Sequence, residues 1–271
     1  MVATKQITSG QTKFHYREFG SGFPIVFFQR FRGTMDDWDP AFVDKIAEHN
    51  RVILFDHVGI GLTEGRTPST ILEIVEGVKH FTDALGLEKF NVLGWSFGGI
   101  VAQVFTLNYP EAVNKAVLVG TGPAASAETV YPSEKFLKLA HKDENTPEDH
   151  QVLFFTETES GLQETLKSLA RINQRAATPI PPTRKESWMM QALAMRDFFT
   201  NPQNYFSRLK EIQQPVLVGG AKNDLAFPLI DSYLLAREIP NAQLITYPQA
   251  GHGFHHQYHA HFGNLVNDFL K

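Results

Sequence analysis

The chain of 271 residues contains no cysteine. Disulfide bonds, thiol nucleophiles and thiolate metal sites are therefore excluded. The absence of cysteine only weakly indicates a reducing compartment, because secreted proteins can also lack cysteine. Long apolar runs are missing as well, since no window reaches the roughly 18 uninterrupted apolar residues of a membrane-spanning helix. The first residues, "MVATKQITSGQTKFHYREFG", are polar and alternating and lack the apolar core of a signal peptide. We therefore expect a cytoplasmic protein.

No long run of one charge sign is present either. The chain has 25 basic and 29 acidic residues and a formal charge of −4. This composition gives no indication of nucleic-acid binding, so we expect a small-molecule partner and no membrane partner, with the oligomeric state left open. With 42% hydrophobic and 20% charged residues, the chain is typical of a soluble globular protein with one large core or two modest domains.

Short apolar runs alternate with segments of helical period in the first half of the chain. Segments near Lys5–Thr8 and Lys13–Phe19 resemble a hairpin, and "GSGFP" predicts a turn after them. The strands expected next are "PIVFFQ", "RVILFD", "FNVLGW" and "KAVLVG", and the helices between them are Asp37–His49, Thr70–Leu85 and Phe97–Tyr109. This alternation predicts an α/β fold with a mostly parallel sheet covered on both faces.

The alternation is interrupted between Gly122 and about Leu209. No convincing buried strand is found there, whereas "SEKFLKLAHK", "GLQETLKSLARINQRAA" and "RKESWMMQALAMRDFF" look helical and "TPIPP" separates the last two. The strands "QPVLVGG" and "AQLITYP", the helix Leu229–Arg237 and a last helix from about His255 then restore the rhythm. We predict one core domain, residues 1–122 and 210–271, with a helical insertion of residues 123–209.

The most specific local motif is "NVLGWSFGG", in which Gly94 to Gly98 satisfy G-x-S-x-G between an expected strand and an expected helix. A serine on such a tight turn has a strained backbone and a projecting hydroxyl, and the flanking glycines leave room for the chain to fold back. The following helix directs its positive end toward the same point, where it would stabilise the negative charge formed when an acyl carbonyl is attacked. The alternative is a glycine-rich turn that only connects strand to helix.

A serine nucleophile needs a base, and the base needs a partner that fixes its tautomer. Asp224 and His252 each follow an expected parallel strand, so both can meet Ser96 at the carboxyl edge of the sheet. Asp224 could instead cap the helix near Pro228, and Asp231 competes for the acid role, although we expect Asp231 to face solvent from within that helix. Several other histidines lie close to His252, but only His252 stands between glycines in the loop; the others are His255, His256, His259 and His261.

Metal and cofactor signals are weak. His255 and His259 have the helical i, i+4 spacing that can bind a divalent metal. No acidic or cysteine ligand stands nearby, however, so we expect solvated histidines at a helix start. No GxGxxG follows a strand, and "DHVGIGLTEG" lacks the lysine of a phosphate loop. We expect no metal and no cofactor.

Over essentially its whole length the chain resembles the α/β-hydrolase superfamily. The resemblance rests on "GSGFP", "DHVGIGLT", "GWSFGG" and the pair "GAKNDLAFP" and "AGHG", in that order. It implies an eight-stranded, mostly parallel sheet with a helical cap, and a triad in which Ser96 is the nucleophile, His252 the general base and then acid, and Asp224 the group that orients the imidazole. The resemblance also implies that the backbone N–H groups of Phe97 and Phe31 form the oxyanion hole.

The chain departs from this family in "VFFQRFRGTMDDW". Gln29 and Arg30 replace a His-Gly pair, and glycine is favoured at the second position because it tolerates backbone conformations closed to larger residues. Arg30 and Arg32 could select an anionic substrate, or each could pair with an acid such as Asp36 or Asp37. Our candidate substrate-contacting residues are Arg30, Trp95, Phe154 and Trp188, with packing of the cap on itself as the alternative for the aromatic residues of the insertion.

The expected activity is hydrolysis of a small carboxylic ester or lactone through an acyl-enzyme. Epoxide hydrolases and haloalkane dehalogenases of this family use an aspartate as the nucleophile. The serine at the corresponding position, Ser96, argues against these two activities. Two alternatives remain open on the sequence: a cofactor-free perhydrolase of haloperoxidase type that uses the same triad, and a ligand-binding homologue without catalysis.

Overall fold

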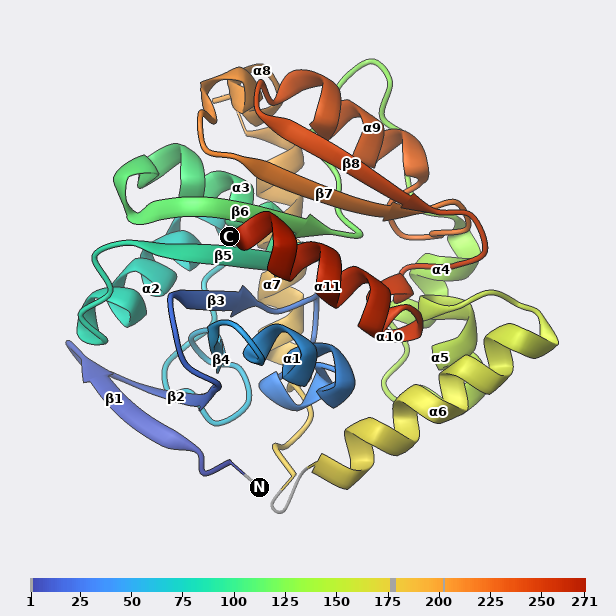
Figure 1. Ribbon diagram of the computed structural model, residues 1–271, viewed down its shortest axis with the longest axis horizontal. Coiled ribbons are helices and arrows are strands. Elements are labelled where there is room, and N and C mark those ends of the chain that lie inside the picture. Colours follow the sequence, from blue (N-terminus) through green and yellow to red (C-terminus); the bar gives the residue numbers. More distant parts are fainter. Residues whose placement is uncertain (1, 176–178, 202) are drawn as a thin grey trace.

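The computed structural model describes residues 2–175, 179–201 and 203–271 and shows an eight-stranded sheet with helices on both faces (Figure 1). The strand order is β1-β2-β4-β3-β5-β6-β7-β8, in which β1 with β2 and β2 with β4 pair antiparallel and all other neighbours pair parallel. The strands are β1 (Lys5–Ser9), β2 (Thr12–Phe19), β3 (Pro24–Phe28), β4 (Arg51–Phe55), β5 (Phe90–Trp95), β6 (Val113–Val119), β7 (Val216–Ala221) and β8 (Ala242–Tyr247). The predicted fold class and the hairpin are confirmed.

The central strands are apolar along their length because both of their faces are covered. In β3, Ile25 and Phe27 belong to one buried cluster, and Val26 and Phe28 belong to the other. Successive side chains of a strand point to opposite faces, so one run of apolar residues supplies both cores. Helices α1 (Pro40–Ala47) and α11 (His259–Leu270) pack together on one face, and α2 (Ile71–Ala84), α3 (Phe97–Asn108) and α9 (Leu229–Glu238) cover the other.

In the described residues between β6 and β7 there are five α-helices. They are α4 (Glu134–Ala140), α5 (Pro147–Phe154), α6 (Glu159–Arg175), α7 (Lys185–Thr200) and α8 (Tyr205–Arg208). Helices α4, α5 and α6 lie on the side of the molecule to which the parallel strands point (Figure 1). Helix α7 differs from them because Ala194 and Phe198 are fully buried in the core cluster beneath α2 and α3. We call residues 123–209 the insertion; the limits given to it from the sequence stay a prediction.

The three helical segments expected in the insertion are present, and no strand is found in its described residues. The last two residues of one segment, and the first of "TPIPP", lie at positions 176–178, outside the described residues. Helix α5 was not expected, because only Leu153 in it is fully buried. Its start did carry a signal, since Thr146 and Asp149 form a capping box around Pro147.

Candidate active site

Ser96 occupies the turn between β5 and α3, and its backbone has the unusual angles φ 57° and ψ −120°. Glycines make this turn sterically feasible: a Cβ on Gly98 would lie 1.9 Å from the carbonyl oxygen of Phe28, and one on Gly94 would lie 2.2 Å from that of Gly98. The Ser96 N–H donates to the Val119 carbonyl at 2.9 Å, and the Thr121 hydroxyl donates to the Ser96 carbonyl at 2.8 Å. Residues at the end of β6 and just after it therefore hold the strained turn in place.

His252 and Asp224 form a buried pair in the loops after β8 and β7. The Nδ1 atom of His252 lies 2.8 Å from Oδ2 of Asp224, and the other carboxylate oxygen accepts the N–H groups of Ala226 and Phe227 at 2.8 and 2.9 Å. The aspartate is thus anchored to its own loop while it fixes the orientation of the imidazole. With Nδ1 engaged, Nε2 is the ring nitrogen left for proton exchange.

The glycines beside His252 allow close contact with the insertion. The Gly253 N–H donates to the carbonyl of Phe154 at 2.6 Å, and a Cβ on Gly251 would lie 2.6 Å from the carbonyl oxygen of Phe155. The ring of Phe154 stacks on that of His252, with centroids 6.1 Å apart. The end of α5 therefore supports the histidine loop directly.

The N–H groups of Phe31 and Phe97 donate to no acceptor in the part of the chain that the structure describes. Phe97 is the first residue of α3, where backbone N–H groups have no partner within the helix. Phe31 lies in the loop after β3, which the buried Gln29 side chain closes by bonding to the Arg30 N–H and the Thr34 carbonyl. Arg30 has no left-handed backbone, and that conformation occurs at Arg32 instead, with φ 63°. The backbone conformation that favours glycine is thus found two residues after the position at which the family pattern has glycine.

Ser96 and His252 line one cavity of about 1160 Å³, which lies between the carboxyl edge of the sheet and the insertion. Arg30, Phe154 and Trp188, three of the candidate substrate-contacting residues, also line it, and their contact with a substrate stays a prediction. Trp95 does not line the cavity; its indole is buried and its Nε1–H donates to the His252 carbonyl at 3.2 Å. We correct the expectation for Trp95, which supports the histidine loop and does not face the cavity.

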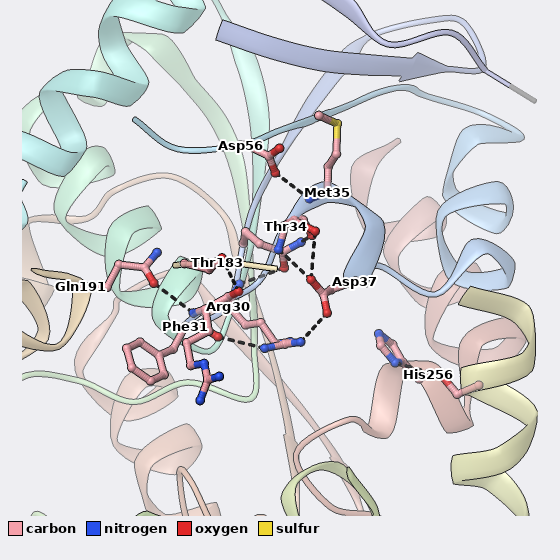
Figure 2. Close-up of polar contacts among 12 residues, drawn as sticks. Arg30, Phe31, Thr34, Met35, Asp37, Asp56, Thr183, Gln191 and His256 are labelled. Carbon is pink, nitrogen blue, oxygen red and sulfur yellow. Dashed lines mark hydrogen bonds and ion pairs between the residues drawn. The ribbon is translucent and has the colours of Figure 1, made fainter. Parts of the chain in front are cut away.

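Arg30 and Arg32 both bind other groups of the protein. Arg30 pairs with Asp37 and donates to the Phe31 carbonyl at 2.9 Å (Figure 2). Its guanidinium also lies over the ring of Phe154. Arg32 donates to backbone carbonyls of the insertion. Of the two roles left open, pairing with an acid is therefore observed for Arg30.

Asp231 is a cavity residue that the sequence argument placed wrongly. It was expected to face solvent from α9, but it is only 5% exposed and lines the cavity together with Ser96 and His252. Burial, and secondarily the charge of Asp224, raise the pKa of Asp231 to about 7. Helix α9 turns this residue toward the sheet, where Gly122 lies against it.

Two histidines of the cluster were also placed wrongly. His255 and His256 are buried around Trp95, not solvated, and burial lowers the pKa of His256 to about 4. The described residues contain no group of three or more His, Cys, Asp or Glu side chains arranged to hold a metal ion. Within the described ranges, no helix is both long and apolar enough to span a membrane.

Known proteins resemble this chain along nearly all of its length. The family described as alpha/beta hydrolase fold matches residues 24–257. The 2-hydroxy-6-oxononadienedioate/2-hydroxy-6-oxononatrienedioate hydrolase of Burkholderia vietnamiensis is 28% identical over 96% of this chain and 92% of its own length. An alpha/beta hydrolase fold protein of Chitinophaga pinensis has a solved structure with a TM-score of 0.90 and 28% identity, covering 100% of this chain and 98% of that chain. The strand order of the sheet and the strained turn at Ser96 agree with the family match, and the chain belongs to the α/β-hydrolase fold family.

Proposed function

We propose that this protein is a serine hydrolase that cleaves a small carboxylic ester or lactone. The observation that carries the proposal is that Ser96, on its strained turn, and His252, with its ring held by Asp224 at 2.8 Å, line the same cavity. Nucleophile, base and orienting acid are the three parts that acyl transfer requires. Their placement on three different loops at one edge of the sheet supports this assignment.

The proposed reaction has two steps. The Ser96 oxygen attacks the substrate carbonyl while His252 takes its proton, and the N–H groups of Phe31 and Phe97 stabilise the oxyanion. The C–O bond to the leaving group then breaks, and the leaving alkoxide takes the proton from His252. Water next attacks the acyl-enzyme, again with His252 as base, and releases the acid and the serine hydroxyl.

The cavity suggests how the substrate is held. Its volume of about 1160 Å³ lies slightly above the usual range for ligand sites, roughly 300–1,000 Å³. Phe31, Phe136, Phe154 and Trp188 give it an aromatic lining, while Arg30 and Asp37 contribute charged groups. We propose that the insertion acts as the cap of this cavity and that the aromatic lining binds an apolar acyl or ring portion.

A second candidate is hydrolysis of a C–C bond beside a ketone. The relative from Burkholderia vietnamiensis is named for a dienedioate that carries an oxo group and no ester. The same serine and oxyanion donors suit attack on a ketone. A panel of matched esters, lactones and β-diketones, with peroxide-dependent bromination in acetate as a further arm, distinguishes ester hydrolysis, C–C hydrolysis and perhydrolysis.

The proposed nucleophile can be tested with p-nitrophenyl esters of short acids. We expect Ser96→Ala to abolish turnover, because no other hydroxyl occupies the turn, and to leave the circular-dichroism spectrum and unfolding midpoint of the protein unchanged. A fluorophosphonate probe should label the wild type at Ser96, and His252→Ala should suppress labelling. Full turnover by Ser96→Ala would refute the mechanism, and a folded wild type that neither reacts nor labels would favour the non-catalytic, ligand-binding alternative.

A further inference from the structure

The peptide group that follows the proposed oxyanion donor is held from two sides. The Phe31 carbonyl accepts a hydrogen bond from the Arg30 guanidinium at 2.9 Å, and this guanidinium is itself paired with Asp37 on the core side. The N–H at the other end of the same peptide group, that of Arg32, donates to Oε1 of Gln191 at 3.0 Å. Figure 2 shows both contacts, with Gln191 approaching from the side opposite to Asp37. Gln191 belongs to α7 of the insertion and is 1% exposed.

Arg32 has a backbone that costs free energy, and the insertion supplies the contacts that hold it. Its φ of 63° lies in the left-handed region, which favours glycine, yet an arginine stands there. The Thr183 hydroxyl donates to the Arg32 carbonyl at 2.6 Å. Together with Gln191, it fixes both backbone polar groups of Arg32 from the insertion.

The Arg32 side chain adds a third attachment. Its guanidinium donates to the carbonyls of Ala140, Lys142 and Asp143 at 2.9, 2.6 and 3.0 Å, and it lies 5.1 Å from the ring of Trp188. These carbonyls lie at and beyond the C-terminal end of α4, where a cation is favoured because the last carbonyls of a helix have no internal partner. A glycine at this position would relieve the strain but could not make this attachment.

We propose that Arg32 is a positioning residue through which the docked insertion sets the direction of the Phe31 N–H. The inference rests on the proposed function, because it assigns that N–H to the oxyanion hole. Only the φ and ψ of Phe31 separate its N–H from the doubly held peptide group. When α4 and α7 are in place, the loop keeps the Phe31 N–H without an acceptor among the described residues, and Phe31 lines the same cavity as Ser96. When they are displaced, the strained backbone of Arg32 relaxes and the donor is lost. Closure of the cap and assembly of the oxyanion hole are thus one event.

Three variants remove the contacts separately: Gln191→Met takes away the acceptor, Thr183→Val the hydroxyl donor, and Arg32→Ala the guanidinium. For each we expect kcat on a short p-nitrophenyl ester to fall by roughly tenfold, less than for outright loss of an oxyanion donor. We expect KM to change by less than about twofold, because the affected contact forms in the transition state. Inhibition by a short-chain trifluoromethyl ketone, whose serine adduct carries the oxyanion, should weaken by the same factor as kcat.

Ser187→Ala is the matched control. The Ser187 hydroxyl also ties α7 to the core, by donating to the Gly59 carbonyl at 2.9 Å, but it does not touch the Phe31 loop. This variant should keep the wild-type kcat and ketone affinity. Thermal unfolding verifies that each variant is folded, and Thr183→Val, which nearly preserves shape, keeps the test open if Arg32→Ala does not fold.

The outcomes separate this inference from the proposed function. Unchanged kcat and ketone affinity in the folded Gln191 and Thr183 variants would overturn the inference, and so would an equal loss in Ser187→Ala. In either case, fluorophosphonate labelling of wild-type Ser96 would still support the proposed hydrolase function. A rise in KM at constant kcat would also overturn it, since the contacts would then serve substrate binding. If the wild type itself neither labels nor turns over esters, the proposed function fails, and the inference with it.

Discussion

Asp231 is a carboxyl group whose charge changes near neutral pH inside the cavity. In the described residues its side chain accepts no hydrogen bond, while Asp224 lies near enough to disfavour a second negative charge. Below pH 7 the carboxyl is mainly protonated and can donate a hydrogen bond to a substrate oxygen. Above pH 7 it becomes an anion in the wall of the cavity.

This change of charge predicts a pH-dependent preference between substrates. As the pH rises through about 7, kcat/KM for an anionic ester should fall relative to that for a matched neutral ester. The expected change in the ratio is about tenfold, because like charges roughly 10 Å apart repel by about 1.5 kcal/mol at an effective dielectric constant near 20. Any effect of pH on the reaction steps that the two esters share cancels in the ratio.

Asp231→Asn is the decisive variant, because it keeps the shape and removes the ionisation. Its ratio of kcat/KM values for the two esters should not change with pH between 5.5 and 8.5. If the wild-type ratio is equally flat, Asp231 does not influence substrate choice.

The sequence predicted single residues well where a local pattern constrains the backbone. Ser96 between glycines, and Asp224 and His252 after their strands, lie where the strand rhythm placed them. Asp231 was misplaced because the face that a helix residue presents depends on how the helix docks, and α9 has a weak apolar stripe. Nothing in "QRFRG" indicated that Arg32 would adopt the left-handed conformation, because its partners are more than 100 residues away.

At the scale of helices, Asp39 joins the core to the insertion. Its carboxylate caps α1 by accepting the Ala41 N–H at 3.0 Å, and it also binds Arg171 of α6 through two nitrogens and the hydroxyl of Ser168. The Asp39 side chain is fully buried, while that of Arg171 is 26% exposed. Burial opposes ionisation of Asp39, but the hydrogen bonds from Arg171 hold its pKa below the ordinary value.

Removing the cation from this pair should be costly. We expect Arg171→Met to lower the free energy of unfolding by about 3 kcal/mol, because it leaves a buried carboxylate without its counter-charge. Urea unfolding measures the change. Lys167→Met on the same helix is the control: its pair with Glu164 is exposed, and it should cost less than about 1 kcal/mol. Equal effects of the two variants would show that the Asp39 contact is no stronger than a surface pair.

At the scale of the whole molecule, burial shifts the pKa of two kinds of side chain in opposite directions. In the described residues, the buried histidines with a lowered pKa outnumber the buried carboxyl groups with a raised pKa. Burial lowers the pKa of His57 and of His256 to about 4, and it lowers that of His255 well below its usual value. The opposite shift occurs at Asp56 and Asp231, where burial raises the pKa to about 7. The histidines add stability that is complete above pH 6.5 and lost as the pH falls toward 4. The carboxyls add stability that is present below their ordinary pKa near 3.8 and lost as the pH rises toward 7.

The balance predicts a protein that weakens in mild acid. Between pH 6.5 and 5 the unfolded chain binds more protons through its histidines than the folded protein retains on the two carboxyls. The free energy of unfolding should therefore fall with decreasing pH, by about 1.4 kcal/mol per unit for each net proton. Urea unfolding at several pH values gives the slope, and Asp231→Asn should steepen it. A wild type equally stable at pH 7 and pH 5 would contradict this prediction.

Helix α7 limits how the cavity can be altered by substitution, because the same helix belongs to the core. Trp188 and Met195 on this helix line the cavity, whereas Ala194 and Phe198 lie in the core cluster that α7 shares with α2 and α3. The wall that meets the substrate is thus continuous with the packing that holds the fold together. Replacing residues 123–209 by the corresponding segment of a relative would separate Ala194 and Phe198 from the side chains that surround them. New substrate ranges are therefore more accessible through point changes on α4 and α5 than through exchange of the whole insertion.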